Sequence, residues 1–177
     1  AGTGTQEALP LERAWTELHM SRERNIVNQV VSNLAAIDGS GYTFDISGSD
    51  QIIVGDQFNP IRVPCAYVFV SKVDTVQEAG ITRLTQYDRT MVLNIVGFVN
   101  ATNDSPGELM LRSLDFQSDV MKCLESDRSL DNGGTVLCDD IEVSGRTFRG
   151  ADLDLPMLGI AALMVTIKYR QDAGTGT

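Results

Sequence analysis

The sequence predicts an α+β fold, with a largely antiparallel or mixed β-sheet of about five to six strands, two main α-helices packed on one face, and a long β-hairpin. Three observations predict it. Residues 87–99, YDRTMVLNIVGFV, alternate in side-chain polarity with the two-residue period of a strand. Residues 26–35 carry apolar side chains at helical spacing. The element order, helix, strands, helix and strands again, favours helices gathered on one face of an antiparallel sheet.

The first element is a helix that begins after Ser21. Ser21 is a favourable N-cap, and Glu23 lies near the positive end of the helix dipole. An amphipathic stripe follows, and the sequence Asp-Gly-Ser-Gly at 38–41 ends it. The residues of this stripe are Ile26, Val27, Val30, Val31, Leu34 and Ala35.

Short strands are expected next at 42–46 and 51–54, separated by Gly and Asp residues. The segment FNPIRVP at 58–64 contains two prolines and is therefore expected to be irregular or to form a sheet edge. CAYVFVSKV at 65–73 has the composition of a central strand. Residues 65–99 are therefore predicted to form the long antiparallel hairpin.

A second helix is predicted from Pro106 to about Glu125. Ser105 is a candidate N-cap, Pro106 takes the first helical position, and Glu108 completes a capping box. The side chains predicted to face the core are Met110, Leu114, Val120, Met121 and Leu124.

The C-terminal third is predicted to add two strands to the sheet. DNGG at 131–134 indicates a turn, and 135–143 is expected to be a strand. The Gly- and Arg-rich segment SGRTFRGAD at 144–152 is interpreted as a loop, and residues 160–170 as the last strand.

The second face of the predicted sheet needs a cover. In the strand at 87–99, Val92, Val96 and Phe98 point away from the side that the helices would cover. Neighbouring subunits would supply the cover in an assembly. Within a single chain, the hairpins and the N-terminal extension would supply it, and the sequence leaves both possibilities open.

Length and composition are those of an ordinary globular protein. With 177 residues, 42% of them hydrophobic and 21% charged, the chain is long enough for one domain with its own core. Residues 1–19 are interpreted as an N-terminal extension, residues 20–170 as a single α+β domain, and residues 171–177 as a flexible C-terminal tail. No apolar run reaches the ~20 residues of a membrane span, and no basic-then-apolar leader predicts export.

The formal net charge of −10 argues against sequence-specific nucleic-acid binding, because an acidic surface repels phosphate. Acidity would suit a protein that lies beside nucleic acid without adhering to it. Solubility alone also explains the charge, and the sequence does not separate the two explanations.

The residues give no indication of catalysis. Phosphate-loop, dinucleotide-binding, zinc-protease and serine-hydrolase motifs do not occur, and the single histidine, His19, lies outside the predicted domain. Cys65, Cys123 and Cys138 are widely spaced among apolar neighbours, which favours buried thiols over disulfides or a zinc site. The segment CDDIE at 138–142 is interpreted as a solvated edge strand. We therefore expect no enzyme, no cofactor and no metal site.

Five segments follow the first helix in a distinctive order: VPCAYVFV, QYDRTMVLNIVGFV, SDVMKCL, IEV and VTIKYR. Over residues 20–170, this order and strand character resemble the tail terminator proteins of long-tailed bacteriophages, also called minor tail or tail-completion proteins. The resemblance implies a virion protein of the tail neck, assembled in the host bacterial cytoplasm, that forms a homohexameric ring on the head-proximal end of the tail tube. The ring would stop polymerisation of the tail tube protein and bind the head-completion or connector protein. Genome DNA would pass through its lumen without specific binding, and no membrane would be involved.

This role gives candidate residues. An acidic lumen would let DNA slide, because each Lys or Arg contact to phosphate adds salt-sensitive drag. A closed ring would also need a head-to-tail contact on each subunit. The candidate lumen or loop acids are Asp139, Asp140, Glu142, Asp152 and Asp154. The candidate subunit or ring contacts are Val92, Val96, Phe98, Asp74, Glu78, Arg146 and Arg149.

Two other interpretations are kept. Another neck component, such as a head–tail adaptor or stopper, would share the ring architecture. A small acidic soluble enzyme or ligand-binding domain would instead be a monomer or dimer with a deep pocket, and it would have to work without a histidine in the domain.

Overall fold

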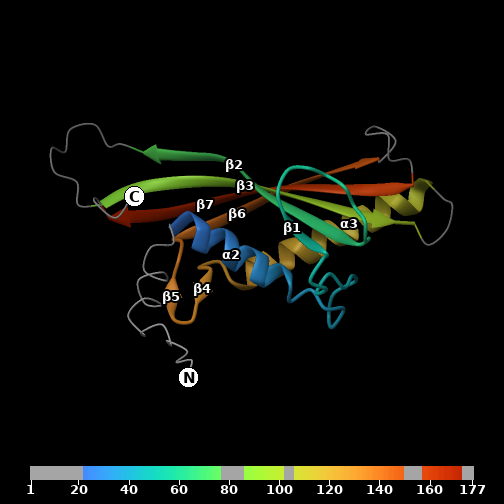
Figure 1. Cartoon of the computed structure of the whole chain (residues 1–177), viewed down its shortest axis with the longest axis horizontal. Coiled ribbons are helices and arrows are strands. Elements are labelled where there is room, and N and C mark those ends of the chain that lie inside the picture. Colours follow the sequence, from blue (N-terminus) through green and yellow to red (C-terminus); the bar gives the residue numbers. More distant parts are fainter. Residues whose placement is uncertain (1–21, 77–85, 102–105, 150–156, 173–177) are drawn as a thin grey trace, which may run out of the picture.

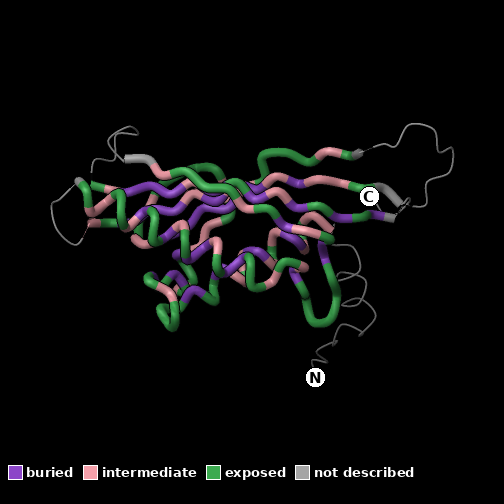
Figure 2. Tube along the Cα trace, turned by 180° about the vertical axis from the view of Figure 1, so that it is seen from behind, coloured by how far each residue is buried: buried purple, intermediate pink, exposed green. Residues whose placement is uncertain are grey.

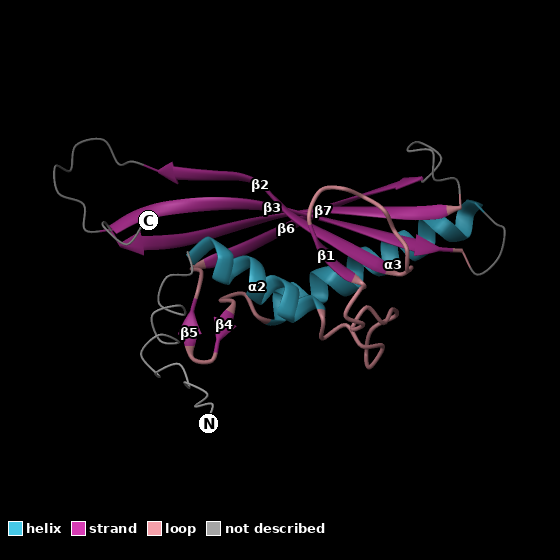
Figure 3. Cartoon of the chain, in the orientation of Figure 1, coloured by secondary structure: helices cyan, strands magenta, loops and turns pink. Residues whose placement is uncertain are grey.

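The computed structural model describes residues 22–76, 86–101, 106–149 and 157–172. In these ranges, helices α2 (Arg22–Leu34) and α3 (Pro106–Ser126) form one layer and a five-stranded mixed sheet forms the other (Figures 1 and 3). The predicted α+β class is confirmed.

The strands of the sheet lie in the order β1-β2-β3-β7-β6. Only β1 and β2 are parallel, and the three other neighbouring pairs are antiparallel. The predicted hairpin is present as β2 and β3. The bounds are β1 (Ile52–Val54), β2 (Cys65–Val76), β3 (Gln86–Asn100), β6 (Asp140–Arg149) and β7 (Leu158–Asp172), with a separate small hairpin of β4 (Asp131–Asn132) and β5 (Thr135–Val136).

The main core lies between the helices and one face of the sheet, hereafter the first face. Figure 2 shows buried residues concentrated along the central strands and the inner sides of the helices. Amphipathic spacing places the buried side chains of each helix on one stripe. These side chains are Ile26, Val30 and Leu34 of α2, Phe116, Val120 and Leu124 of α3, and Met91, Leu93, Ile95, Leu163, Val165 and Ile167 of the sheet.

Close approach of α3 to the sheet requires glycine on the strands beneath it. A Cβ atom at Gly97 of β3 would lie 2.1 Å from the Phe116 ring, and one at Gly159 of β7 would lie 2.7 Å from the Leu109 carbonyl oxygen. Because packed interiors leave no room for such overlap, these positions fix where α3 sits.

Residues 42–46, predicted as a strand, form only an isolated bridge between Asp38 and Asp45. Their backbone finds another partner. The buried carboxylate of Asp119 on α3 accepts hydrogen bonds from the backbone N–H groups of Thr43 and Phe44, at 2.8 and 2.9 Å. The alternating pattern of this segment therefore serves burial of Phe44 against α3 rather than strand pairing.

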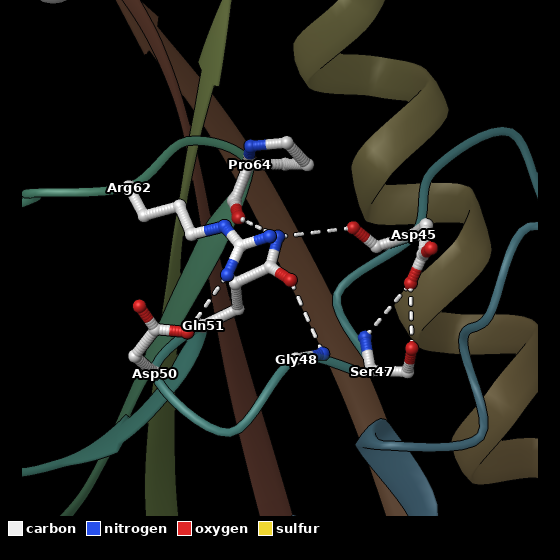
Figure 4. Close-up of polar contacts among 7 residues, drawn as sticks. All are labelled: Asp45, Ser47, Gly48, Asp50, Gln51, Arg62 and Pro64. Atoms are coloured by element: carbon white, nitrogen blue, oxygen red, sulfur yellow. Dashed lines mark hydrogen bonds and ion pairs between the residues drawn. The ribbon is translucent and has the colours of Figure 1, made fainter.

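Gln51 holds together the loops that flank β1 (Figure 4). Its buried side-chain amide donates to the carbonyl oxygens of Asp45 and Pro64, at 3.1 and 2.8 Å, and accepts from the backbone N–H of Gly48 at 3.1 Å. Nearby, Arg62 pairs with Asp50 at 3.0 Å on the exposed surface. The irregular segment predicted at 58–64 is confirmed, and Gln51 ties its end to the fold.

Two further expectations are corrected by the structure. The segment 144–149, predicted as part of a loop, continues β6 and pairs with β7 as far as Arg149. The strand predicted at 135–143 is interrupted, because residues 137–139 lie between β5 and β6 without strand structure. Within the described ranges, no helix is long and apolar enough to cross a membrane.

Candidate functional site: the second face of the sheet

The second face of the sheet, opposite the helices, is partly covered by the chain itself. The segment at 55–64 lies over one end of it, and the Phe58 ring packs against Tyr67, Phe69 and Phe98 with centroids 5.3, 5.9 and 5.8 Å apart. The Tyr67 hydroxyl accepts a hydrogen bond from the backbone N–H of Asn59 at 3.0 Å. This small second core consists of Cys65, Tyr67, Phe98 and Ile160.

Phe98, a candidate subunit contact on the second face, is covered by its own chain instead. The side chain does point to the second face, but the segment at 55–64 leaves it 0% exposed. Of the two covers that the sequence allowed, the chain supplies its own at this end of the sheet.

The middle of the second face is open and hollowed. A groove of about 400 Å³, hereafter the sheet groove, crosses β2, β3, β7 and β6 there. It is hollowed where the side chains are small, at Ala162 and Ser144, and larger side chains form its walls. Strand register aligns its lining in two rows, of which one is Phe69, Asn94, Met164 and Ser144, and the next is Val96, Ala162 and Arg146.

The sheet groove presents apolar surface to solvent. Met164 is 48% exposed, and Phe69, Val96 and Ala162 are half-buried. Val92, also half-buried, lies opposite Thr166 in the row on the other side of Asn94. The structure thus places Val92 and Val96 on the second face, as predicted, beside the groove or in it. Whether they contact another subunit stays a prediction.

The far end of the second face is charged, with acids and bases interleaved. Arg128 pairs with Asp140 at 2.7 Å, and this hydrogen bond holds the pKa of the Asp140 carboxyl below its ordinary value. Arg170 lies 3.2 Å from Asp88 and 3.9 Å from Asp139. Two of the predicted acids, Asp139 and Asp140, therefore stand beside bases, and this region is not uniformly negative.

The remaining candidate acids and subunit contacts lie at separate places in the fold or outside the described residues. Asp74 of β2 pairs with Lys72, and Glu142 is exposed on β6. Arg149 ends β6, but its side chain is not described. Glu78, Asp152 and Asp154 lie outside the described residues.

The outer side of α3 carries apolar residues that face solvent. Met110, Leu111 and Leu114 are 50%, 64% and 43% exposed, and they are called the α3 ridge below. Met110 and Leu114 were predicted to be buried, which is wrong, because the stripe through Phe116 and Val120 faces the sheet instead. Leu111 was missed altogether, although its place beside Met110 and Leu114 could have indicated a second apolar stripe.

Two strand edges also lack a partner in the described part of the chain. β6 pairs only with β7, which leaves its outer edge unpaired over Asp140–Arg149. β1 pairs with β2 only as far as Val68, so the rest of β2 is an edge as well. Unpaired backbone groups at such edges can bond to another chain.

The thiols are poorly suited to chemistry. Cys65, Cys123 and Cys138 are each at most 2% exposed, and burial raises the pKa of each thiol to about 11. They are therefore protonated at neutral pH, whereas a nucleophile or metal ligand must be a thiolate. Among the described residues, no three His, Cys, Asp or Glu side chains cluster as metal ligands would.

Comparisons of the chain with models of protein families and with curated proteins found no match.

Proposed function

We propose that this chain is a structural protein of a tailed-phage virion, a tail terminator whose hexameric ring caps the head-proximal end of the tail tube. In this role it stops tube polymerisation and joins the tail to the head-completion or connector protein. The proposal starts from the resemblance of residues 20–170 and from the surfaces described above.

The observation that carries the proposal is that several surfaces expose apolar side chains or unpaired backbone groups. The sheet groove and the α3 ridge expose apolar side chains, and the outer edge of β6 exposes backbone hydrogen-bonding groups. Apolar patches and open edges on one small domain are typical of proteins that assemble. These surfaces differ from one another, so a contact between two of them is head-to-tail, the kind that generates rings.

Fewer of the candidate acids suit an acidic lumen than the sequence predicted. Asp139 and Asp140 stand next to Arg170 and Arg128, and such pairs do not repel DNA as isolated acids would. Of the described candidate acids, Glu142 forms no ion pair within the described residues, and it lies on the second face of the edge strand β6. We therefore retain Glu142 as the described lumen candidate, within a chain whose net charge of −10 disfavours phosphate binding.

Two alternatives remain, and a specific observation favours the second. A head–tail adaptor or stopper would use the same unsatisfied surfaces in a different ring of the neck. A ligand-binding domain is favoured by the volume of the sheet groove, because about 400 Å³ falls within the range of small-molecule sites. Such a domain would be a monomer or dimer and would bind no tail tubes.

Imaging of virions made without this protein tests the proposal. We expect heads separated from tails, with tails of uncontrolled length, because nothing would stop the tube or join it to the head. Tails of normal length that lack heads would favour the adaptor or stopper. Normal, joined particles would overturn a role in the neck.

A further inference from the structure

We propose that neighbouring copies meet through two surfaces identified here, with the α3 ridge of one copy seated in the sheet groove of the next. This inference rests on the proposed function, and it names the partner of the groove: a second copy of this chain.

The α3 ridge is built to project from the helix layer. Met110, Leu111 and Leu114 are spaced by one, three and four residues, so that they share one side of the helix. The side chains that α3 buries, such as Phe116 and Val120, turn toward the sheet. The ridge therefore points away from its own core, and a Leu that is 64% exposed has apolar surface to bury.

The sheet groove is the complementary shape. Ala162 and Ser144 leave the hollow, while Phe69 and Met164 provide apolar walls for inserted side chains. Its volume of about 400 Å³ makes it a site for a few large side chains rather than for a whole helix. The groove lies on the sheet face opposite the helices and the ridge projects from the helix layer, so both can be occupied in the same copy. Figure 1 shows the helices together on one side of the sheet.

Charge favours this pairing over symmetric ones. Asp115 is exposed next to the ridge, and Arg146 is exposed in the groove. Within the described residues, neither side chain forms a salt bridge or a side-chain hydrogen bond. A ridge-to-ridge contact would oppose Asp115 to its own copy, and a groove-to-groove contact would oppose Arg146 to its own copy. Only the head-to-tail contact places the acid near the base.

Disulfide trapping tests the contact. Leu114→Cys and Met164→Cys are made as separate variants of the full chain, differently tagged, and oxidised alone or as a mixture. The native thiols contribute little background, because each is at most 2% exposed. We expect the mixture to give a disulfide-linked heterodimer at least tenfold more abundantly than either variant gives a homodimer.

Other outcomes overturn the inference. A homodimer of Leu114→Cys alone would show a symmetric helix contact, and a homodimer of Met164→Cys alone would show a symmetric sheet contact. A mixture that stays uncrosslinked would show that ridge and groove do not meet. If rings form without the mixed disulfide, the contact is wrong while the terminator proposal stands. If the mixed disulfide forms but virions lacking the protein are normal, the contact stands and the proposed function falls.

A charged substitution gives a second measurement with a matched control. Met164→Glu puts a carboxylate into the groove, whereas Val136→Glu puts one at a comparably exposed apolar site on β5, away from both surfaces. We expect Met164→Glu to raise the concentration needed for assembly at least tenfold and Val136→Glu to leave it unchanged. Equal effects of the two variants, with both folded by circular dichroism, would contradict the inference.

Discussion

Tyr169 of β7 donates its phenolic hydrogen bond to the carboxylate of Glu23 in the first turn of α2, at 2.8 Å. Arg89 of β3 donates to the same carboxylate oxygen, also at 2.8 Å. One partly buried acid therefore ties the helix layer to two central strands. Burial raises the pKa of the Glu23 carboxyl, but hydrogen bonds from the backbone, Tyr169 and Arg89 outweigh it and hold the pKa below its ordinary value.

The first prediction concerns Glu23→Gln. The substitution keeps the shape but removes the charge that Arg89 and Tyr169 both bond. Hydrogen bonds to charged groups contribute about 1.5–3 kcal/mol, so we expect the free energy of unfolding to fall by about 1–3 kcal/mol in urea titrations. Glu125→Gln, at an exposed site on the same helix layer, is the control and should cost less than about 0.5 kcal/mol. A Glu23→Gln variant as stable as the wild type would show that this junction contributes nothing.

A second prediction is the pH dependence of the same junction. Because the pKa of Glu23 is lowered on folding, its contribution is fully present above the ordinary value of 4.5 and is lost as pH falls through the lower folded pKa. The pKa of Tyr169 is raised to about 12, by burial and by Glu23, so its contribution is present below pH 10 and is lost as pH rises toward 12. Thermal unfolding midpoints should therefore drop less steeply below pH 4.5 in Glu23→Gln than in the wild type. Parallel acid profiles would contradict this.

The third prediction concerns Gly97→Ala. The added Cβ would lie 2.1 Å from the Phe116 ring, so either the ring or α3 must move. Overpacking of this kind typically costs about 1–3 kcal/mol. The double variant Gly97→Ala, Phe116→Leu relieves the contact and should lose less than the two single losses added together. Additive losses in chemical denaturation would mean that Gly97 and Phe116 do not constrain each other.

The fourth prediction separates a buried clamp from a surface ion pair. Gln51→Ala removes the three hydrogen bonds of a buried side-chain amide, and an intramolecular hydrogen bond contributes about 0.5–1.5 kcal/mol. Arg62→Ala breaks the neighbouring exposed pair with Asp50, and exposed pairs contribute about 0–1 kcal/mol. We expect hydrogen exchange at the Gly48 amide to accelerate in Gln51→Ala and not in Arg62→Ala. The reverse order would show that the ion pair, and not the amide, holds the loops.

Hydrophobic periodicity predicted correctly the helices and strands that bury a single stripe of apolar side chains. Residues 22–34 and the hairpin strands show this, since a two-residue or a 3.6-residue period is visible in the sequence without knowledge of partners. The bounds of the second helix were predicted correctly, but the side of it that faces the sheet was not. Apolar side chains occur on both of its sides, and the choice of Phe116 over Met110 as the inward side depends on Gly97 of a distant strand.

Long-range pairing also overrode local composition. The Gly- and Arg-rich residues 144–149 lack strand propensity, yet β7 offers them a free edge and they pair along it. Residues 42–46 have the propensity but lie against α3 instead of a strand edge, and Asp119 takes up their backbone donors. The second face was foreseen as apolar from Val92, Val96 and Phe98. Its division into a covered end, an open groove and a charged end depends on Phe58 and on strand register, neither of which local sequence reveals.

The most direct test of the central claim is the mass of the wild-type protein. It is measured by light scattering with and without purified tail tubes, and the same samples are then imaged by electron microscopy. A subunit whose groove and ridge are completed by copies of itself should form a closed hexamer of the 19.2 kDa chain, in solution or on the tube end. Tubes capped by such rings should also stop growing. A protein that stays monomeric, or forms only a symmetric dimer, and leaves tube growth unchanged would contradict the account.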